Sequence, residues 1–328
     1  MRVLITGGGG FLGRTLARRL LERGSLTGVT GQAEPIDSLV LFDVAHPPDG
    51  VAAPRVERVT GDVADSRLLG SIIDRDDVSV FHLASMVSAG CEADFDGALD
   101  VNLGGTRAVL QACRDRSSKP RLVFTSSIAA FGGEAVAGVV SDTTKLTPET
   151  TYGMTKAIGE LLINDYTRKG FLDGRSARLP TVVVRPGRPN AAASSWVSGI
   201  FREPLAGEEA IVPVDPTIKV PISGYRTVVD NLIRLHEADG QALGSDRGLN
   251  LPSIAVTAEE MLAGLRTAAD RPLGPVTFRE DPLIVRIFTG WAQEASWDRA
   301  RALGLAVDDG IEPIVKAYIE DFLEPSGT

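Results

Sequence analysis

The feature that constrains this chain most is a run of glycines directly after a short apolar segment. Residues 3–6, Val-Leu-Ile-Thr, have the length and composition of a buried β-strand, and Gly7 to Gly10, with Gly13, follow at once. Phe11 to Arg23 then repeat apolar residues at helical spacing. A strand that passes into a helix through glycines gathers free backbone N–H groups at the positive end of the helix dipole. This arrangement predicts a phosphate-binding turn.

The spacing of the glycines makes the prediction more specific. Gly7, Gly10 and Gly13 form a G-x-x-G-x-x-G pattern, and the neighbouring glycines also allow G-x-G-x-x-G. In such loops one glycine permits a tight turn, one lets the backbone approach a pyrophosphate, and one lets the helix pack closely on the strand. The sequence therefore predicts a dinucleotide site that includes Gly7, Gly10, Phe11 and Leu12. The alternative is a purely structural turn.

Short apolar segments alternate with longer amphipathic ones from this loop to about residue 185. Strands are predicted at Val3–Thr6, Leu39–Phe42, Val56–Thr60, Val80–Ala84, Leu122–Thr125 and Val182–Arg185. Helices are predicted at Phe11–Arg23, Arg67–Ile73, Phe95–Cys113 and Tyr152–Tyr166. Such alternation implies right-handed crossovers and a parallel sheet covered on both faces. The predicted fold is α/β, a Rossmann-type doubly wound parallel sheet.

Beyond Arg185 the pattern becomes irregular, because proline, glycine and serine interrupt it. We expect residues 1–186 to form the dinucleotide-binding domain and residues 187–328 to form mainly a smaller, interleaved substrate-binding region. Some of its segments should return to pack on the first domain. The regular segments expected there are helices at Thr227–Glu237, Ala258–Thr267 and Ile314–Leu323, and a strand at Gly248–Leu251.

Composition excludes several classes of function. The 328 residues carry a net charge of -9, whereas nucleic-acid binding requires a concentrated basic face, so we expect no nucleic-acid partner. Two cysteines, Cys91 and Cys113, specify neither a disulfide framework nor a zinc site, and three scattered histidines predict no metal centre. Neither a leader peptide nor an uninterrupted apolar span is evident, so we expect a cytoplasmic protein without a membrane partner.

Acidic residues follow two of the predicted strands. Asp43 ends the second strand, where a carboxylate would accept hydrogen bonds from ribose hydroxyls and repel a 2'-phosphate. Residues 44–46 contain no arginine or lysine that would offset this repulsion, so the pattern favours NAD over NADP. Asp62 and Val63 follow the third strand, where the adenine ring would lie. The alternative for Asp62 is a loop cap.

Tyr152 and Lys156 form a candidate catalytic pair. At positions i and i+4 they share one face of a predicted helix, so the ammonium should favour the ionised phenol and lower its pKa from near 10. Tyr152 would then serve as a general acid or base. The alternative is a solvated helix face. Ser127, which follows the fifth predicted strand 25 residues upstream, strengthens the catalytic interpretation.

These motifs together resemble a known family, the extended short-chain dehydrogenases/reductases, also called the NAD-dependent epimerase/dehydratase family. The resemblance spans nearly the whole chain. It includes the glycine loop, Asp43, Gly61-Asp62-Val63, His82-Leu83-Ala84, Asn102 within Val101 to Thr106, Thr125-Ser126-Ser127, the Tyr152/Lys156 pair and Arg185-Pro186-Gly187.

The resemblance implies a role for each matching residue. Ser127 would hydrogen-bond the substrate oxygen, Tyr152 would be the acid/base, and Lys156 would hold the nicotinamide ribose of NAD. Leu83, Ala84 and Pro186 would contact the cofactor. Asn102 is more structural than catalytic in extended members of the family. The resemblance also implies a homodimer, formed by Phe95–Cys113 and Tyr152–Tyr166 of each subunit.

Departures from the family pattern narrow the expected reaction. Sugar-nucleotide dehydratases carry an acidic pair after the serine position, whereas residues 128–130 here are Ile-Ala-Ala. An epimerase that keeps NAD bound and returns the hydride stays possible, although no basic cluster for a second pyrophosphate is evident. The stretches 185–196 and 202–209 are most similar to family members that oxidise carbon 2 of a four-carbon sugar acid with NAD. A dinucleotide-sensing protein without catalysis is the alternative from another class.

A small sugar acid needs a guanidinium for its carboxylate and polar groups for its hydroxyls. Arg188 and Arg226 are the candidate guanidinium groups, with structural ion pairs as the alternative. Ser88, Asn190 and Ser194 are candidate donors to the substrate hydroxyls, with ordinary loop hydrogen bonds as the alternative. The sequence thus predicts an NAD-dependent oxidation of a small-molecule sugar acid, by Ser127, Tyr152 and Lys156.

Overall fold

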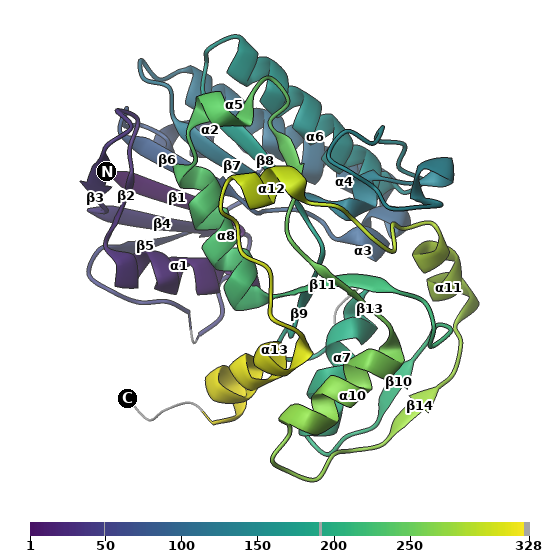
Figure 1. The fold of residues 1–328 in the computed structure, drawn as a ribbon. Coiled ribbons are helices and arrows are strands. Elements are labelled where there is room, and N and C mark those ends of the chain that lie inside the picture. The colour runs from purple at the N-terminus through teal and green to yellow at the C-terminus, as the bar shows by residue number, and fades with distance from the viewer. Residues whose placement is uncertain (49, 190–191, 325–328) are drawn as a thin grey trace.

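A seven-stranded, all-parallel sheet forms the centre of the protein, as the computed structural model shows for residues 1–48, 50–189 and 192–324 (Figure 1). Its strand order is β12-β8-β7-β6-β1-β4-β5. The strands are β1 (Arg2–Thr6), β4 (Ser38–Asp43), β5 (Val56–Thr60), β6 (Val78–His82), β7 (Arg121–Ser127), β8 (Asp173–Leu179) and β12 (Gly248–Asn250). The predicted doubly wound α/β fold is confirmed.

Helices cover both faces of the sheet. Alternate residues of β1 point to opposite faces, so Val3 and Ile5 pack in one core cluster with α1 (Phe11–Arg23) and α8 (Tyr225–Glu237). Leu4 packs in another cluster, with α2 (Ser66–Ile72) and α5 (Gly105–Arg114). On this second side α6 (Thr151–Arg168) also packs on β7 and β8. Burial on both faces explains why the strands read as continuous apolar runs.

The strand order reverses at β1, which pairs with β4 on one side and β6 on the other. The crossovers from these two neighbours leave in opposite directions, so a crevice opens outside the carboxyl end of β1. The glycine loop follows β1 directly and therefore lies in this crevice.

One predicted strand of the main sheet is wrong. The sequence pointed to Val182–Arg185, but the strand beside β7 is β8, whose residues are Asp-Gly-Arg-Ser-Ala-Arg-Leu. Arg175 and Arg178 of β8 are 0% and 3% exposed. Ion pairs with Asp173 and Glu160 accompany this burial, so the strand lacks the apolar signature that the prediction relied on.

The segment that was predicted instead belongs to a separate small sheet. There β9 (Thr181–Val183) pairs with β11 (Val220–Gly224), which pairs with β13 (Ile254–Val256). The predicted strand at 248–251 is confirmed as β12, which returns to the main sheet beside β8. The domain boundary near residue 186 stays a prediction.

The region beyond β9, whose helices α7 (Ser195–Leu205) and α10 (Ala258–Ala268) lie in the lower part of Figure 1, has a hydrophobic cluster of its own. Two of its helices, α10 and α13 (Ile311–Tyr318), agree with the sequence-based predictions, whereas α7, whose last turn holds Pro204, was not predicted. Its further elements are α11 (Pro282–Thr289), β10 (Ala210–Val212) and β14 (Val276–Phe278).

Smaller elements complete the described chain. They are β2 (Ser25–Thr27), β3 (Ala33–Pro35), α3 (Ser88–Ala93), α4 (Phe95–Ala98), α9 (Gly240–Leu243) and α12 (Asp298–Ala302). Over residues 1–48, 50–189 and 192–324, no helix combines the length and apolar character needed to cross a bilayer.

Candidate active site

A cavity of about 650 Å³ begins at the glycine loop and extends to α7. Most of the residues that the sequence assigned to the cofactor line it. They are Gly7, Gly10, Phe11, Leu12, Asp43, Asp62, Val63, Leu83, Ala84, Tyr152 and Lys156. Pro186 is described in the structure but does not line this cavity. The structure thus brings residues from five separate segments of the chain to one cavity.

The glycine loop is shaped by backbone contacts that leave no room for side chains. Gly7 has a φ of +74°, and a Cβ there would lie 2.9 Å from the backbone N of Ala84. A Cβ on Gly13 would lie 2.2 Å from the carbonyl O of Gly7, which explains how α1 packs so close to the loop. The N-cap residue of α1 is Gly10, which has no side chain to occupy the first N–H groups. The loop therefore fits a pyrophosphate.

Asp43 is held at the cavity edge by the same loop. Its carboxylate accepts a 2.9 Å hydrogen bond from the backbone N–H of Gly9. A Cβ on Gly9 would lie 2.2 Å from the carbonyl O of Ala45, so only glycine allows this close approach. The carboxylate is thereby fixed at the end of β4, next to the loop, in a position suited to hydroxyl donors.

Lys156 is buried beneath the cavity at the end of β7. Its side chain is 3% exposed, and Nζ donates a 2.9 Å hydrogen bond to the carbonyl O of Thr125. Nζ also lies 5.4 Å from the ring centroid of Tyr152 and 5.0 Å from that of Phe124. Burial lowers the pKa of Lys156 to about 8. The ammonium is therefore still mostly charged at neutral pH.

The protein by itself does not make the Tyr152 phenol acidic, contrary to the expectation from the i, i+4 spacing. Burial raises the pKa of Tyr152 to about 12, because the charged phenolate loses hydration. A hydrogen bond with the side chain of Ser127 acts in the opposite direction but is the smaller effect. Lys156 contacts the ring and a carbonyl, so it does not offset the burial.

Ser127 ends β7 with its hydroxyl oxygen already fixed. Oγ accepts a 3.1 Å hydrogen bond from the backbone N–H of Ala129. Because this bond uses a lone pair, the hydroxyl proton can be donated to another oxygen. Ser127 is thus placed to hydrogen-bond either the Tyr152 phenol or a substrate oxygen.

Asn102 ties α6 to the loop after β6. It lies in a π-helical turn, Leu99–Gly104, that joins α4 to α5. Its Nδ2 donates to the Thr155 hydroxyl at 3.1 Å, and its Oδ1 accepts from the backbone N–H of Met86 at 2.7 Å. Thr155 precedes Lys156, so these bonds help to fix the part of α6 that carries the candidate catalytic pair.

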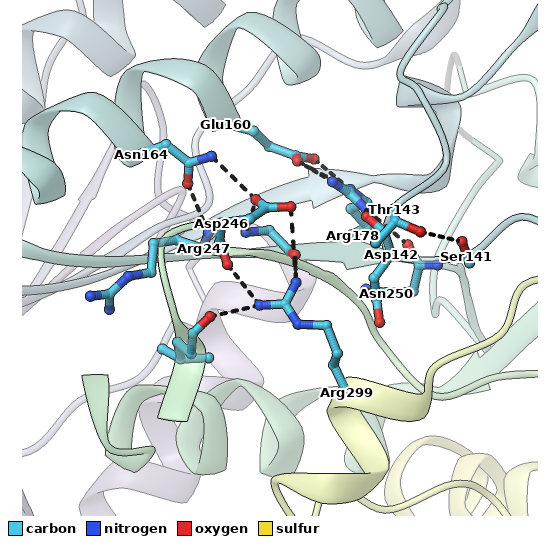
Figure 2. A network of polar contacts seen from close by, with 12 residues as sticks. Ser141, Asp142, Thr143, Glu160, Asn164, Arg178, Asp246, Arg247, Asn250 and Arg299 are labelled. Carbon is cyan, nitrogen blue, oxygen red and sulfur yellow. Dashed lines mark hydrogen bonds and ion pairs between the residues drawn. The ribbon is translucent and has the colours of Figure 1, made fainter. Parts of the chain in front are cut away.

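A buried polar network fixes the other side of the same helix (Figure 2). The carboxylate of Glu160 lies 2.8 Å from the Arg178 guanidinium, and both side chains are 3% exposed. The Ser126 hydroxyl donates to Glu160 at 2.5 Å, which connects the end of β7 to α6. Arg178 also donates to the carbonyl O of Asp142, and Asp142 accepts from the backbone N–H of Asn250 in β12.

The predicted substrate residues are mostly not in the cavity. Arg226 forms ion pairs with Glu320 and Asp321, and it does not line the cavity. Arg188 is exposed and likewise does not line the cavity. The structure therefore brings neither arginine to the cavity, and a contact of either one with the substrate stays a prediction.

The other candidates for substrate hydroxyls have different outcomes. Ser88 is buried outside the cavity lining, where its Oγ accepts a 3.3 Å hydrogen bond from the backbone N–H of Ala193. Ser194 lines the cavity. Asn190 lies outside the described residues.

Two arginines that sequence reasoning did not propose do line the cavity, Arg185 and Arg202. Arg202 lies on α7, and its cavity-lining neighbours Ser195 and Ser198 precede it at helical spacing. This spacing could have identified Arg202 as a site residue from the sequence, but only if residues 195–205 had been predicted to form a helix.

The fold and the site together define a Rossmann-type oxidoreductase that uses a nicotinamide cofactor. The model of the NAD dependent epimerase/dehydratase family matches residues 3–220, and the chain belongs to that family. The chain is 47% identical to D-erythronate dehydrogenase of Cupriavidus necator, and the match covers 98% of each chain. It is 40% identical to D-erythronate dehydrogenase of Haemophilus influenzae, with 98% of this chain and 99% of the relative covered.

A solved structure gives the same architecture under a different functional description. A nucleoside-diphosphate-sugar epimerase from Agrobacterium tumefaciens superposes with a TM-score of 0.89 at 37% identity. The superposition covers 99% of this chain and 95% of that one. The fold is therefore shared by relatives described as dehydrogenases and by one described as an epimerase.

Proposed function

We propose that this protein is an NAD-dependent dehydrogenase that oxidises a small sugar acid at carbon 2, with D-erythronate as the first choice. The observation that carries the proposal is that Tyr152 and Lys156 line the cavity that also contains the glycine loop, with the Ser127 side chain hydrogen-bonded to Tyr152. The names of the two D-erythronate dehydrogenase relatives support the choice of substrate. The product would be the 2-oxo acid.

The residues around the loop support NAD as the cofactor. The first turn of α1 offers its N–H groups to the pyrophosphate, and Asp43 accepts from the adenosine ribose hydroxyls. A 2'-phosphate would meet the Asp43 carboxylate, so NAD is favoured over NADP. Asp62 and Val63 would lie beside the adenine, and Lys156 would hold the nicotinamide ribose. When bound, NAD supplies the hydride acceptor.

The protein's own part of the reaction is the movement of one proton. Tyr152 would take the proton of the C2 hydroxyl at its phenolic oxygen, and Ser127 would donate a hydrogen bond to the oxygen of the substrate. The pKa of about 12 shows that burial alone keeps the phenol protonated. A positive charge beside the phenol, such as that of the oxidised nicotinamide, would therefore be required to lower the pKa of Tyr152. The base would then be effective only when NAD is bound.

The second candidate function is a sugar-nucleotide epimerase, which the Agrobacterium tumefaciens relative suggests. An epimerase returns the hydride to its substrate, so the cofactor is not consumed. A dehydratase is disfavoured because Ile128–Ala130 form a buried turn with no acid.

NADH absorbance distinguishes these functions. We expect purified protein to accumulate NADH with NAD and D-erythronate, and not with UDP-glucose or UDP-galactose. Accumulation should fail in the Tyr152→Phe variant. No NADH from any of a panel of four- to six-carbon aldonates would contradict the dehydrogenase, and interconversion of UDP-sugars without net NADH would establish the epimerase.

We also propose a homodimer, in which α4 and α6 of two subunits pack together. Phe95 on α4 and Leu161 on α6 are 54% and 66% exposed, and the two helices are neighbours, so both apolar side chains are available to a partner subunit. Light scattering should give twice the chain mass for the wild type and a smaller mass for Leu161→Glu. A wild-type monomer at micromolar concentration would contradict the dimer.

A further inference from the structure

The charged residues of the cavity separate by sign. Among the described lining residues, Asp43 and Asp62 are the acidic ones and belong to the glycine-loop end. Lys156, Arg185 and Arg202 are the basic ones and follow toward α7. A ligand whose negative charge lies beyond the reacting carbon would therefore be favoured by the electrostatic potential of the cavity.

Arg202 is built into the cavity wall and keeps hydrogen-bonding capacity. The residue is 7% exposed, and its NH1 donates to the carbonyl O of Arg185 at 2.8 Å. Its NH2 donates to Glu203 at 2.5 Å. A guanidinium carries five N–H donors, and these two bonds use two of them. Arg202 is therefore oriented by its neighbours and can still bind a carboxylate.

Arg185 lies close enough to Arg202 for the two charges to interact. Burial lowers the pKa of Arg185, and the nearby Arg202 charge lowers it further. The backbone N–H of Arg185 donates to the Ser198 hydroxyl at 3.0 Å, which connects it to α7. Its NH1 donates to the carbonyl O of Arg188 at 2.8 Å. Two like charges that lie close together on a partly buried side of the cavity repel each other, so an anion that binds between them stabilises both.

In the part of the chain that the structure describes, one carboxylate is hydrogen-bonded to this pair of arginines. Glu203 forms the ion pair with Arg202, and its other oxygen, Oε2, is buried without a hydrogen-bond partner among the described residues. One negative charge against two positive charges leaves a net charge of about +1 at this end of the cavity. That excess matches a monocarboxylate substrate.

We propose that Arg202, assisted by Arg185, binds the carboxylate of the substrate and thereby sets the preference for an acid. The inference rests on the proposed function, because it assumes that the substrate is a hydroxy acid. It replaces Arg188 and Arg226 as the carboxylate-binding residues. Arginine suits this role because its planar fork matches both oxygens of a carboxylate.

The test compares an acid with a neutral analogue of the same shape. The Arg202→Gln variant should raise the KM for D-erythronate about 10- to 100-fold, the size expected for a hydrogen bond to a charged group. The kcat/KM for D-erythronamide, which has no charge at carbon 1, should change by less than about threefold. The KM for NAD should stay the same. Arg202→Lys should recover part of the loss.

A matched control separates charge loss from carboxylate binding. Arg271 also pairs with an acidic neighbour in sequence, Asp270, but does not line the cavity. Arg271→Gln should leave both substrates unaffected. If Arg202→Gln alone is unstable because Glu203 is left unpaired, the double variant with Glu203→Gln removes both charges and should show the same loss of acid preference.

The outcomes distinguish this inference from the proposed function. If the wild type oxidises D-erythronate but Arg202→Gln and Arg185→Gln keep its KM, the inference is overturned. A rise in KM only in Arg188→Gln would overturn it in favour of that residue. Weaker UDP-glucose binding in Arg202→Gln, with unchanged acid kinetics, would assign the pair to a diphosphate instead. A wild type that oxidises no hydroxy acid would overturn the proposed function as well.

Discussion

The two ends of the cavity are built in different ways. The glycine-loop end is centred on one short turn, Gly7 to Gly13, whose shape depends on backbone contacts such as that between Gly13 and Gly7. The α7 end is made by Arg185 and Arg202, which are positioned by a helix that packs in a different hydrophobic cluster. A site formed by the backbone can be recognised from spacing, whereas a site formed by converging side chains depends on long-range packing.

The candidate catalytic pair lies between these two ends, and Tyr152→Phe should have the largest effect. Removing the phenolic oxygen abolishes proton transfer, so kcat should fall about 10²- to 10⁴-fold. NAD affinity, measured by titration of protein fluorescence, should change little because the ring is kept. Full turnover by this variant would mean that a residue other than Tyr152 is the general base.

The buried ion pair between Glu160 and Arg178 should contribute more to the stability of the fold than to cofactor binding. Glu160→Gln leaves the Arg178 charge buried without its partner, so the free energy of unfolding should fall by about 3–5 kcal/mol. Chemical denaturation would measure this loss. A double variant, Glu160→Leu with Arg178→Met, should recover part of the stability because neither charge remains. An unchanged denaturation midpoint in Glu160→Gln would show that the network contributes nothing.

At the glycine-loop end, a single methyl group should be sufficient to disturb binding. In Gly13→Ala the new Cβ would meet the carbonyl O of Gly7 at 2.2 Å, and backbone cannot move aside easily. We expect a loss of about 1–3 kcal/mol in stability and weaker NAD binding. Gly70→Ala is the control, since a Cβ there would have no atom within 4 Å apart from its own helix backbone and chain neighbours. Equal NAD affinity in both variants would contradict backbone control of this end.

A substitution of Asp43 tests how strongly the glycine-loop end of the cavity discriminates between NAD and NADP. Asp43→Ser removes the carboxylate that would repel a 2'-phosphate, so the ratio of kcat/KM for NAD to that for NADP should fall about tenfold. A ratio that does not change would indicate that other groups select the cofactor.

A further expected effect is a loss of stability at low pH, caused by a histidine that is buried next to Thr6 at the start of the glycine loop. His82 is 1% exposed and lies between the hydroxyls of Thr6 and Thr106. Burial lowers its pKa to about 3 from the usual 6.5, so the unfolded chain binds a proton that the folded chain does not. Stability should therefore be complete above pH 6.5 and decline from there toward pH 3.

The His82 contribution to this decline can be separated by substitution from that of His236, whose pKa is also lowered by burial. A single extra proton in the unfolded state gives a slope of about 1.4 kcal/mol per pH unit. His82→Gln should reduce the slope of the unfolding free energy between pH 6 and pH 4 by that amount. An identical slope in the variant would show that His82 binds protons equally in the folded and unfolded states.

Sequence reasoning predicted the strands that are apolar and failed at the strand that is not. It found β1 and β4 because their buried residues are almost all apolar, and it missed β8 because Arg175 and Arg178 are buried with the carboxylate partners Asp173 and Glu160. The same limit explains the choice of Arg188 and Arg226 over Arg202. A charged residue in isolation does not show whether its partner is a substrate or an ion pair.

The sequence by itself determined the dinucleotide loop, the carboxylate that follows β4 and the placement of Tyr152 and Lys156 on one helix. Each depends on spacing within a single turn or element. Tertiary structure decided which arginines reach the cavity, that a polar segment completes the sheet, and that the phenol stays protonated in the protein alone. These properties follow from burial and from contacts between distant segments, because desolvation and partner charges set both the position and the ionisation of a side chain.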